Sequence, residues 1–100
     1  MNVTIYTIHV GFAVNGSLQA VDTNRVLLLS ILYARHPNGF TVFDRIGYFK
    51  GNEEPGASVV IIDDGSNESF IKETALLIKG DLCQDEVWLT SKEEKLEIIS

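Results

Sequence analysis

The order of its secondary-structure signals constrains the fold of this chain more than any other feature. β-branched and aromatic runs, helix caps and turn residues predict six elements in the order strand, helix, strand, strand, helix, strand. The predicted strands span residues 3–14, 40–49, 58–63 and 86–91, and the predicted helices run from about 22 to 36 and from about 67 to 80. In 100 residues this pattern leaves room for one core and one domain.

The ends of both predicted helices have recognisable signals. Asp22, Thr23 or Asn24 can cap the first helix, and Pro37 followed by Gly39 stops it. Gly80 ends the second helix. Each helix therefore connects two strands, and a polar loop over residues 50–57 joins the two middle strands.

This order has one common solution, the ferredoxin-like split βαβ fold of the α+β class. It predicts a four-stranded antiparallel sheet in the spatial order 4-1-3-2, with two helices on one face. Residues 1–91 would form the domain. Residues 92–100 would form a charged C-terminal tail, either a last helical turn or a frayed extension.

The third predicted strand is apolar on both sides. Val59 and Ile61 point to one face of the sheet, and Val60 and Ile62 point to the other. Two helices cover only one face, and monomeric proteins rarely leave a large apolar patch in water. We therefore expect the helix-free face to meet a partner or a second copy in a homodimer or higher oligomer, unless the tail or the long loop folds over it.

The charge of the chain limits its partners. Residues 1–50 have a net charge of +2 and residues 51–100 a net charge of −8, which sum to −6. Direct binding of nucleic acid is not expected, because the phosphate backbone would be repelled. The acidic second half either docks on a basic protein or keeps the protein soluble.

Neither a membrane span nor a signal peptide is expected, because no uninterrupted apolar run exceeds four residues. The lone Cys83 cannot form an internal disulfide. We therefore expect a cytoplasmic protein.

Motifs for catalysis, metals and cofactors are absent from the sequence. His9 and His36 have no further ligand at zinc-like spacing, and no phosphate-binding glycine loop or nucleophile elbow is present. We expect no metal, no cofactor and no catalytic residues, and a binding function is favoured over an enzymatic one.

The second predicted strand contains the best candidates for ligand binding. Arg45 and Lys50 are two of only eight cations, and Tyr48 can stack and donate a hydrogen bond. These properties suit an anion or nucleotide site, although an ordinary strand with solvated charges fits equally well. Trp88 could stack on a base, and His9 completes the set of candidate ligand-binding residues.

Two segments of the sequence resemble a known group of proteins. Residues 39–51 read GFTVFDRIGYFKG, and residues 84–90 read QDEVWLT. The pattern is similar to that of a family of small uncharacterised proteins from phages and bacteria, although Asp85-Glu86 stands where that family has Glu-Ser. The resemblance implies a ferredoxin-like fold and a phage or mobile-element context. It implies no activity.

Together these features favour a non-catalytic phage-type protein that counteracts a host defence in the host cytoplasm. As an oligomer it would sequester a nucleotide-derived signal, with Arg45 and Lys50 on phosphate and Tyr48 or Trp88 on the base. One alternative is an acidic inhibitor that docks on a basic host protein, such as a nuclease or a CRISPR-type effector. Another is a small enzyme with its site in a dimer cleft, where a carboxylate or His9 would meet the substrate.

Overall fold

A computed structural model describes the backbone of residues 1–100 and every side chain except that of Phe49, which lies outside the described residues. The six predicted elements are present in the predicted order. They are β1 (Asn2–Gly11), α1 (Val21–Arg35), β2 (Thr41–Phe49), β3 (Asn52–Asp63), α2 (Glu68–Asp81) and β4 (Trp88–Lys95).

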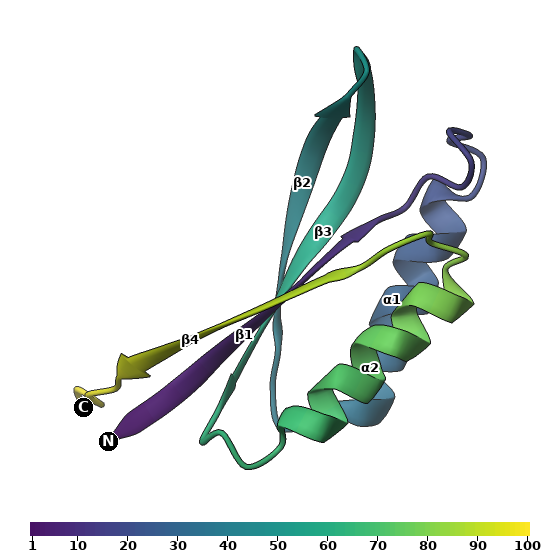
Figure 1. The fold of residues 1–100 in the computed structure, drawn as a ribbon. Coiled ribbons are helices and arrows are strands. Elements are labelled where there is room, and N and C mark those ends of the chain that lie inside the picture. The colour runs from purple at the N-terminus through teal and green to yellow at the C-terminus, as the bar shows by residue number, and fades with distance from the viewer.

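The strands form one antiparallel sheet in the order β2-β3-β1-β4. This is the predicted order 4-1-3-2 viewed from the other edge. Both helices lie on the same face of the sheet (Figure 1). The ferredoxin-like α+β fold is thus confirmed.

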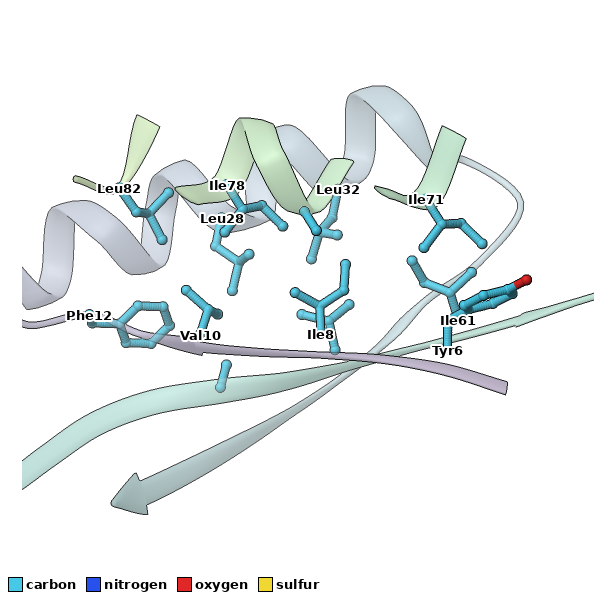
Figure 2. Close-up of a cluster of buried hydrophobic side chains, with 13 residues drawn as sticks. Tyr6, Ile8, Val10, Phe12, Leu28, Leu32, Ile61, Ile71, Ile78 and Leu82 are labelled. Carbon is cyan, nitrogen blue, oxygen red and sulfur yellow. The ribbon is translucent and has the colours of Figure 1, made fainter. Parts of the chain in front are cut away.

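The core lies between this face and the two helices. Alternate residues of β1 and β3 point toward the helices, which supply a stripe spaced three or four residues apart (Figure 2). The largest fully buried apolar side chains are Ile8, Val10, Phe12, Leu28, Leu32, Val59, Ile71, Ile78 and Leu82.

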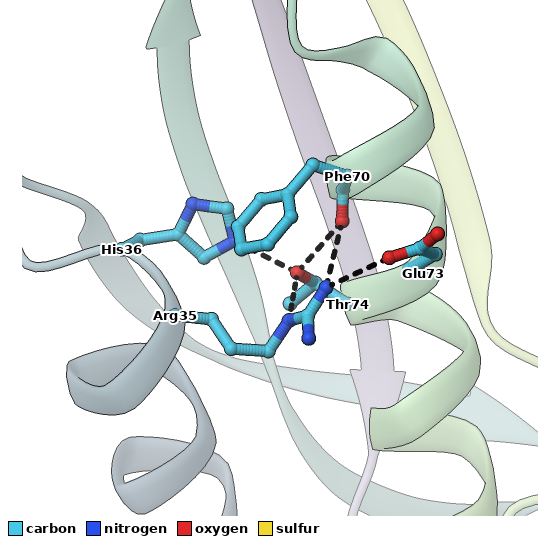
Figure 3. Close-up of polar contacts among 5 residues, drawn as sticks. All are labelled: Arg35, His36, Phe70, Glu73 and Thr74. Atoms are coloured by element: carbon cyan, nitrogen blue, oxygen red, sulfur yellow. Dashed lines mark hydrogen bonds and ion pairs between the residues drawn. The ribbon is translucent and has the colours of Figure 1, made fainter.

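A polar junction joins the C-terminal end of α1 to α2 (Figure 3). The Arg35 Nε donates to the Thr74 Oγ1 at 2.8 Å, and the His36 Nε2 lies 2.9 Å from the same oxygen. The Arg35 guanidinium lies 4.1 Å from the centre of the Phe70 ring and 3.4 Å from the Glu73 carboxylate. The junction links the two helices above the sheet.

The segment predicted as a polar loop is instead part of a long β2–β3 hairpin. Lys50 and Gly51 both have positive φ, at 50° and 79°, as a tight two-residue hairpin turn requires. The chain therefore reverses at once, and β3 begins at Asn52 rather than at residue 58. Polar residues fit this hairpin because both of its sides are exposed.

The strand β4 extends beyond its predicted end. Residues 92–95 pair with residues 2–5 of β1, so the first four residues of the predicted tail belong to the sheet. A run of four charged residues is compatible with a strand at a sheet edge, where side chains reach water. Beyond β4, the Leu96 N–H donates to the Met1 carbonyl at 2.7 Å.

The helix-free face of the sheet stays uncovered by the described residues. Phe43 and Ile62 on this face are 57% and 58% exposed. Neither the tail nor the hairpin folds over them. Along the described chain, no helix is both long and apolar enough to cross a membrane.

Candidate functional site

A hollow of about 820 Å³ lies at the end of the sheet where β1 finishes and β4 starts. The pairing of β1 with β3 stops at Gly11 and Gly56, but the β2–β3 hairpin continues past this point as a projecting arm (Figure 1). This arm forms one wall. The loop after β1 and the segment that leads into β4 form the others.

All five residues predicted to bind a ligand line this hollow. His9 comes from β1, Arg45 and Tyr48 from β2, Lys50 from the hairpin turn, and Trp88 from the start of β4. Residues up to 79 positions apart in the sequence therefore meet at one place.

Sheet register explains why His9, Trp88 and Arg45 meet on the helix-free side. His9 pairs with Trp88 on one side and with Ser58 on the other, and Arg45 pairs with Gly56, two residues before Ser58. Directly paired residues project to the same face. Tyr48 lies an odd number of positions from Arg45, so it points to the opposite face of β2 on the projecting arm.

His9 is held by a neighbouring strand and is biased toward its neutral form. Its Nδ1 lies 3.0 Å from the Ser58 Oγ. Partial burial lowers the pKa of His9 below its ordinary value of 6.5, and the positive charge of Arg45 lowers it further. A neutral imidazole can both donate and accept a hydrogen bond at neutral pH.

Gly56 allows two strands to meet closely beside the hollow. A Cβ at this position would lie 2.3 Å from the Val10 carbonyl oxygen, closer than atoms can approach. The position therefore admits only glycine without a backbone shift.

Two amide side chains that sequence reasoning did not assign to the site hold the loops around it. The Gln84 Nε2 donates to the Ala13 carbonyl at 2.9 Å and to the Leu82 carbonyl at 3.1 Å. The buried Asn24 donates its Nδ2 to the Leu82 and Phe12 carbonyls, at 3.1 and 2.8 Å. The walls of the hollow are thus tied to each other and to α1.

The role of Asn24 differs from the predicted one. The sequence offers Asn24 as one of three possible helix caps, but the N-cap of α1 is Ala20, with no side-chain hydrogen bond. Asn24 lies inside the first turns and faces the core, 4% exposed. The spacing along the helix could have indicated this position. Asn24 lies four residues before Leu28 and eight before Leu32, and these three residues form one buried stripe.

The charge around the hollow is more negative than the predicted anion site suggests. Two cations, Arg45 and Lys50, face four carboxylates, namely Glu53, Glu54, Asp85 and Glu86. This surplus disfavours a ligand with several phosphates. It favours an uncharged or cationic ligand.

Two aromatic rings at the hollow are available for stacking. Trp88 is 62% exposed and Tyr48 is 73% exposed. The Trp88 Nε1 donates to the Glu86 carboxylate at 3.1 Å, which orients the indole while its faces stay open. Exposed aromatic rings of this kind can bind the flat base of a nucleoside.

The hollow offers no evident metal site. Among the described side chains, no group of three or more His, Cys, Asp and Glu residues is arranged to hold a metal ion. Cys83 is exposed and lines the hollow with a free thiol.

Comparisons with known proteins identify the fold. No family model and no curated protein sequence matches this chain. It is similar in structure to a DUF3240 family protein from Shewanella baltica OS155, with a TM-score of 0.67 and 7% identity over 98% of this chain and 97% of the other. The chain thus shares its fold with a protein of similar length.

A second structural likeness is to a phage SAM lyase in complex with S-methyl-5'-thioadenosine. The TM-score is 0.59, with 16% identity over 91% of this chain and 81% of the lyase. The apo lyase gives a TM-score of 0.57 with 14% identity, over 90% and 79%. At these identities the likeness shows a shared fold. The resemblance of residues 39–51 and 84–90 to a phage and bacterial family stays a prediction.

Proposed function

We propose that this protein binds a nucleoside-derived small molecule in the hollow at the end of the sheet, as a phage-type protein directed against a host defence. The observation that supports this most is the gathering of His9, Arg45, Tyr48, Lys50 and Trp88 around one hollow. Its volume of about 820 Å³ is within the range of small-molecule sites, roughly 300–1,000 Å³.

The charge of the hollow narrows the ligand to an uncharged or cationic nucleoside. Four carboxylates against two cations would repel an oligophosphate. S-Methyl-5'-thioadenosine, the ligand of the phage lyase with the same fold, is an uncharged nucleoside thioether. S-Adenosylmethionine carries a sulfonium centre, an ammonium group and a carboxylate, so it has a net positive charge that the carboxylates of the hollow would attract.

Four of the five predicted site residues have a stated chemical role in this proposal. Trp88 stacks on the base, and Tyr48 contacts the ligand from the projecting hairpin. Arg45 and neutral His9 hydrogen-bond to acceptors on the sugar or base. Glu53 and Glu54 accept hydrogen bonds from ribose hydroxyls or neutralise a cationic substituent.

Calorimetric titration tests the proposal. The panel is S-methyl-5'-thioadenosine, S-adenosylmethionine, ATP and a cyclic dinucleotide. We expect the first two to bind more tightly than the phosphorylated ligands and Trp88→Ala to lose binding. Tyr33→Ala, which removes an exposed aromatic of α1 outside the hollow, should bind like the wild type.

Absence of binding across the panel would overturn the proposal. If, in addition, neutralising Asp85 and Glu86 abolished capture of a basic host protein, an acidic docking surface would take its place.

A second candidate is a small enzyme that uses the same hollow. Two observations favour it. The fold is shared with a lyase, and His9, whose lowered pKa favours the neutral imidazole, lines the hollow. Incubation with S-adenosylmethionine followed by mass spectrometry separates the two functions. Time-dependent release of S-methyl-5'-thioadenosine that His9→Ala abolishes indicates an enzyme, and binding without conversion indicates a sequestering protein.

A further inference from the structure

A second, smaller groove of about 280 Å³ lies on the helix side of the sheet, between α2 and β4. Its apolar lining comes from Ala75 and Leu76 of α2, from Val87 just before β4, and from Leu89 of β4. Trp88 lies between the last two and lines the hollow instead. The two cavities share no lining residue, so the groove is a separate surface.

The groove is apolar, open and next to an unpaired sheet edge. Leu76 is 68% exposed although it lines the groove. In the sheet, β4 pairs with β1 alone, so its outer edge offers free backbone N–H and C=O groups. An extended apolar segment could pair with such an edge and bury its side chains in the groove.

Lysines stand at the rim of the groove. Lys72 and Lys79 belong to its lining, one helical turn on either side of Ala75 and Leu76. Lys72 contacts Glu68 only in an exposed pair at 3.9 Å, and Lys79 makes no ion pair with the side chains that the structure describes. The rim therefore suits an acidic segment.

The C-terminal tail of this chain has the matching properties. Ile98 and Ile99 are 73% and 89% exposed, among the most exposed large apolar side chains of the molecule. Glu97 precedes them with a negative charge. The tail combines two apolar side chains with an acidic one, and the groove combines an apolar floor with two basic groups.

The tail cannot reach the groove of its own molecule. It begins beside Met1, whose amino group lies 3.1 Å from the Leu96 carbonyl at the far end of β4 (Figure 1). Seven residues of strand separate Leu89 from Leu96, a distance of about 23 Å. The three residues from Leu96 to Ile99 span at most about 11 Å.

We infer that the tail of a second copy of this chain occupies the groove between α2 and β4. Ile98 and Ile99 of that copy pack against Leu76 and Leu89, and its Glu97 faces the lysines of the rim, Lys72 and Lys79. Each copy offers both a tail and a groove, so this contact links copies into an oligomer. It uses a surface other than the helix-free face on which the sequence-based expectation of self-association rests.

A labelled peptide with the sequence of residues 94–100 tests the contact directly. The receptor is the full chain with Ile98→Glu and Ile99→Glu, which keeps the groove and disables its own exposed tail. Burial of each isoleucine is worth about 1.5–3 kcal/mol, roughly tenfold or more in affinity. We therefore expect fluorescence anisotropy to show binding of the peptide, and at least tenfold weaker binding of a peptide with glutamate at both isoleucine positions.

Two further receptors locate the binding surface. Adding Leu76→Glu to the receptor should weaken peptide binding at least tenfold, whereas adding Ile46→Glu, at an exposed isoleucine of the hairpin, should not change it.

Sedimentation should give a higher mass for the wild type than for the Ile98→Glu, Ile99→Glu variant. No binding of the wild-type peptide, equal binding to the Leu76→Glu receptor, or equal masses would overturn the inference. Titration of nucleosides into the hollow is unaffected by any of these outcomes, so the proposed function is judged separately.

Discussion

The two faces of the sheet have similar residues in β3 but different surroundings. Val59 and Ile61 lie beneath the helices and are 0% and 5% exposed, whereas Ile62, their neighbour in the strand, is 58% exposed on the other face. Periodicity predicts that both faces are apolar. It does not say which face the helices cover, because that depends on where α1 and α2 pack.

Because one face is covered and the other is open, the two faces should contribute to different properties of the protein, namely its stability and its binding of a ligand. The covered face and both helices form the core, so its side chains contribute most of the hydrophobic free energy of folding. The open face carries His9, Arg45 and Trp88, which lead into the hollow. Substitutions on the first face should change the free energy of unfolding, and those on the second should change binding.

Ile61→Asp should have the largest effect, because it places a charge in the core beneath the helices. The cost is several kcal/mol, comparable with the whole stability of a small domain, roughly 5–15 kcal/mol. We expect no cooperative melting transition by circular dichroism. The matched change Ile62→Asp on the open face should give a folded protein. A cooperatively melting Ile61→Asp variant would show that the two faces are equivalent.

Arg45→Ala should change binding without changing stability. Loss of a charge-assisted hydrogen bond should weaken nucleoside binding by about 1.5–3 kcal/mol in calorimetry. The melting temperature should stay the same, because an exposed arginine contributes little to folding. Lys92→Ala, on the same open face but outside the hollow, should bind like the wild type. A lower melting temperature with unchanged affinity would assign Arg45 to structure.

Asn24→Ala tests the connection between the core and the hollow. It removes both hydrogen bonds to the Phe12 and Leu82 carbonyls. Leaving a buried acceptor unpaired should lower the free energy of unfolding by about 1–3 kcal/mol in denaturant titration. Thr23→Ala, at an exposed position one residue earlier in α1, should change it by less than about 0.5 kcal/mol.

Protonation of His36, on the helix side of the sheet, and of His9, on the open face, should have the smallest effect on stability. Burial and the neighbouring Arg35 charge lower the pKa of His36 below 6.5, and burial and Arg45 lower that of His9. In the unfolded chain both bind protons more readily, so stability is full above about pH 6.5 and falls as the pH drops toward their folded pKa values. The melting temperature should therefore decrease between pH 7 and pH 5.

The variants His36→Gln and His9→Gln should each show a shallower decrease. Tyr33→Phe, which leaves both histidines in place, should follow the wild-type curve. If neither histidine variant changed the slope, other groups would be responsible for the pH dependence.

Local signals were sufficient for the element order but not for element lengths. Pro37 and Gly39 do end α1, and α2 ends within one residue of Gly80. The length of the hairpin was missed because Lys50 is not a residue that favours positive φ, although Gly51 beside it is. The extension of β4 was missed because the charged run of residues 92–95 predicts an edge strand only when a partner strand is known.

Sequence reasoning selected residues that line one hollow, and their role in binding stays a prediction. Arg45 and Lys50 stand out because cations are few, and the structure places them around the hollow with Tyr48, His9 and Trp88. The acidic surplus escaped sequence reasoning, because Glu53 and Glu54 lie in the part of the hairpin that was predicted as a loop, and Asp85 and Glu86 come from the opposite wall. Their charges act together only through space.

The sequence by itself determined what depends on near neighbours: the order of strands and helices, the apolar periodicity of the core, and hence the fold class. These follow from backbone propensity and side-chain alternation, which act over a few residues. The tertiary structure alone decided which face is covered, that Asn24 and Gln84 tie the walls of the hollow, and that carboxylates outnumber cations around it. Those properties depend on residues distant in sequence, whose proximity is set by strand register and by the packing of helices on the sheet.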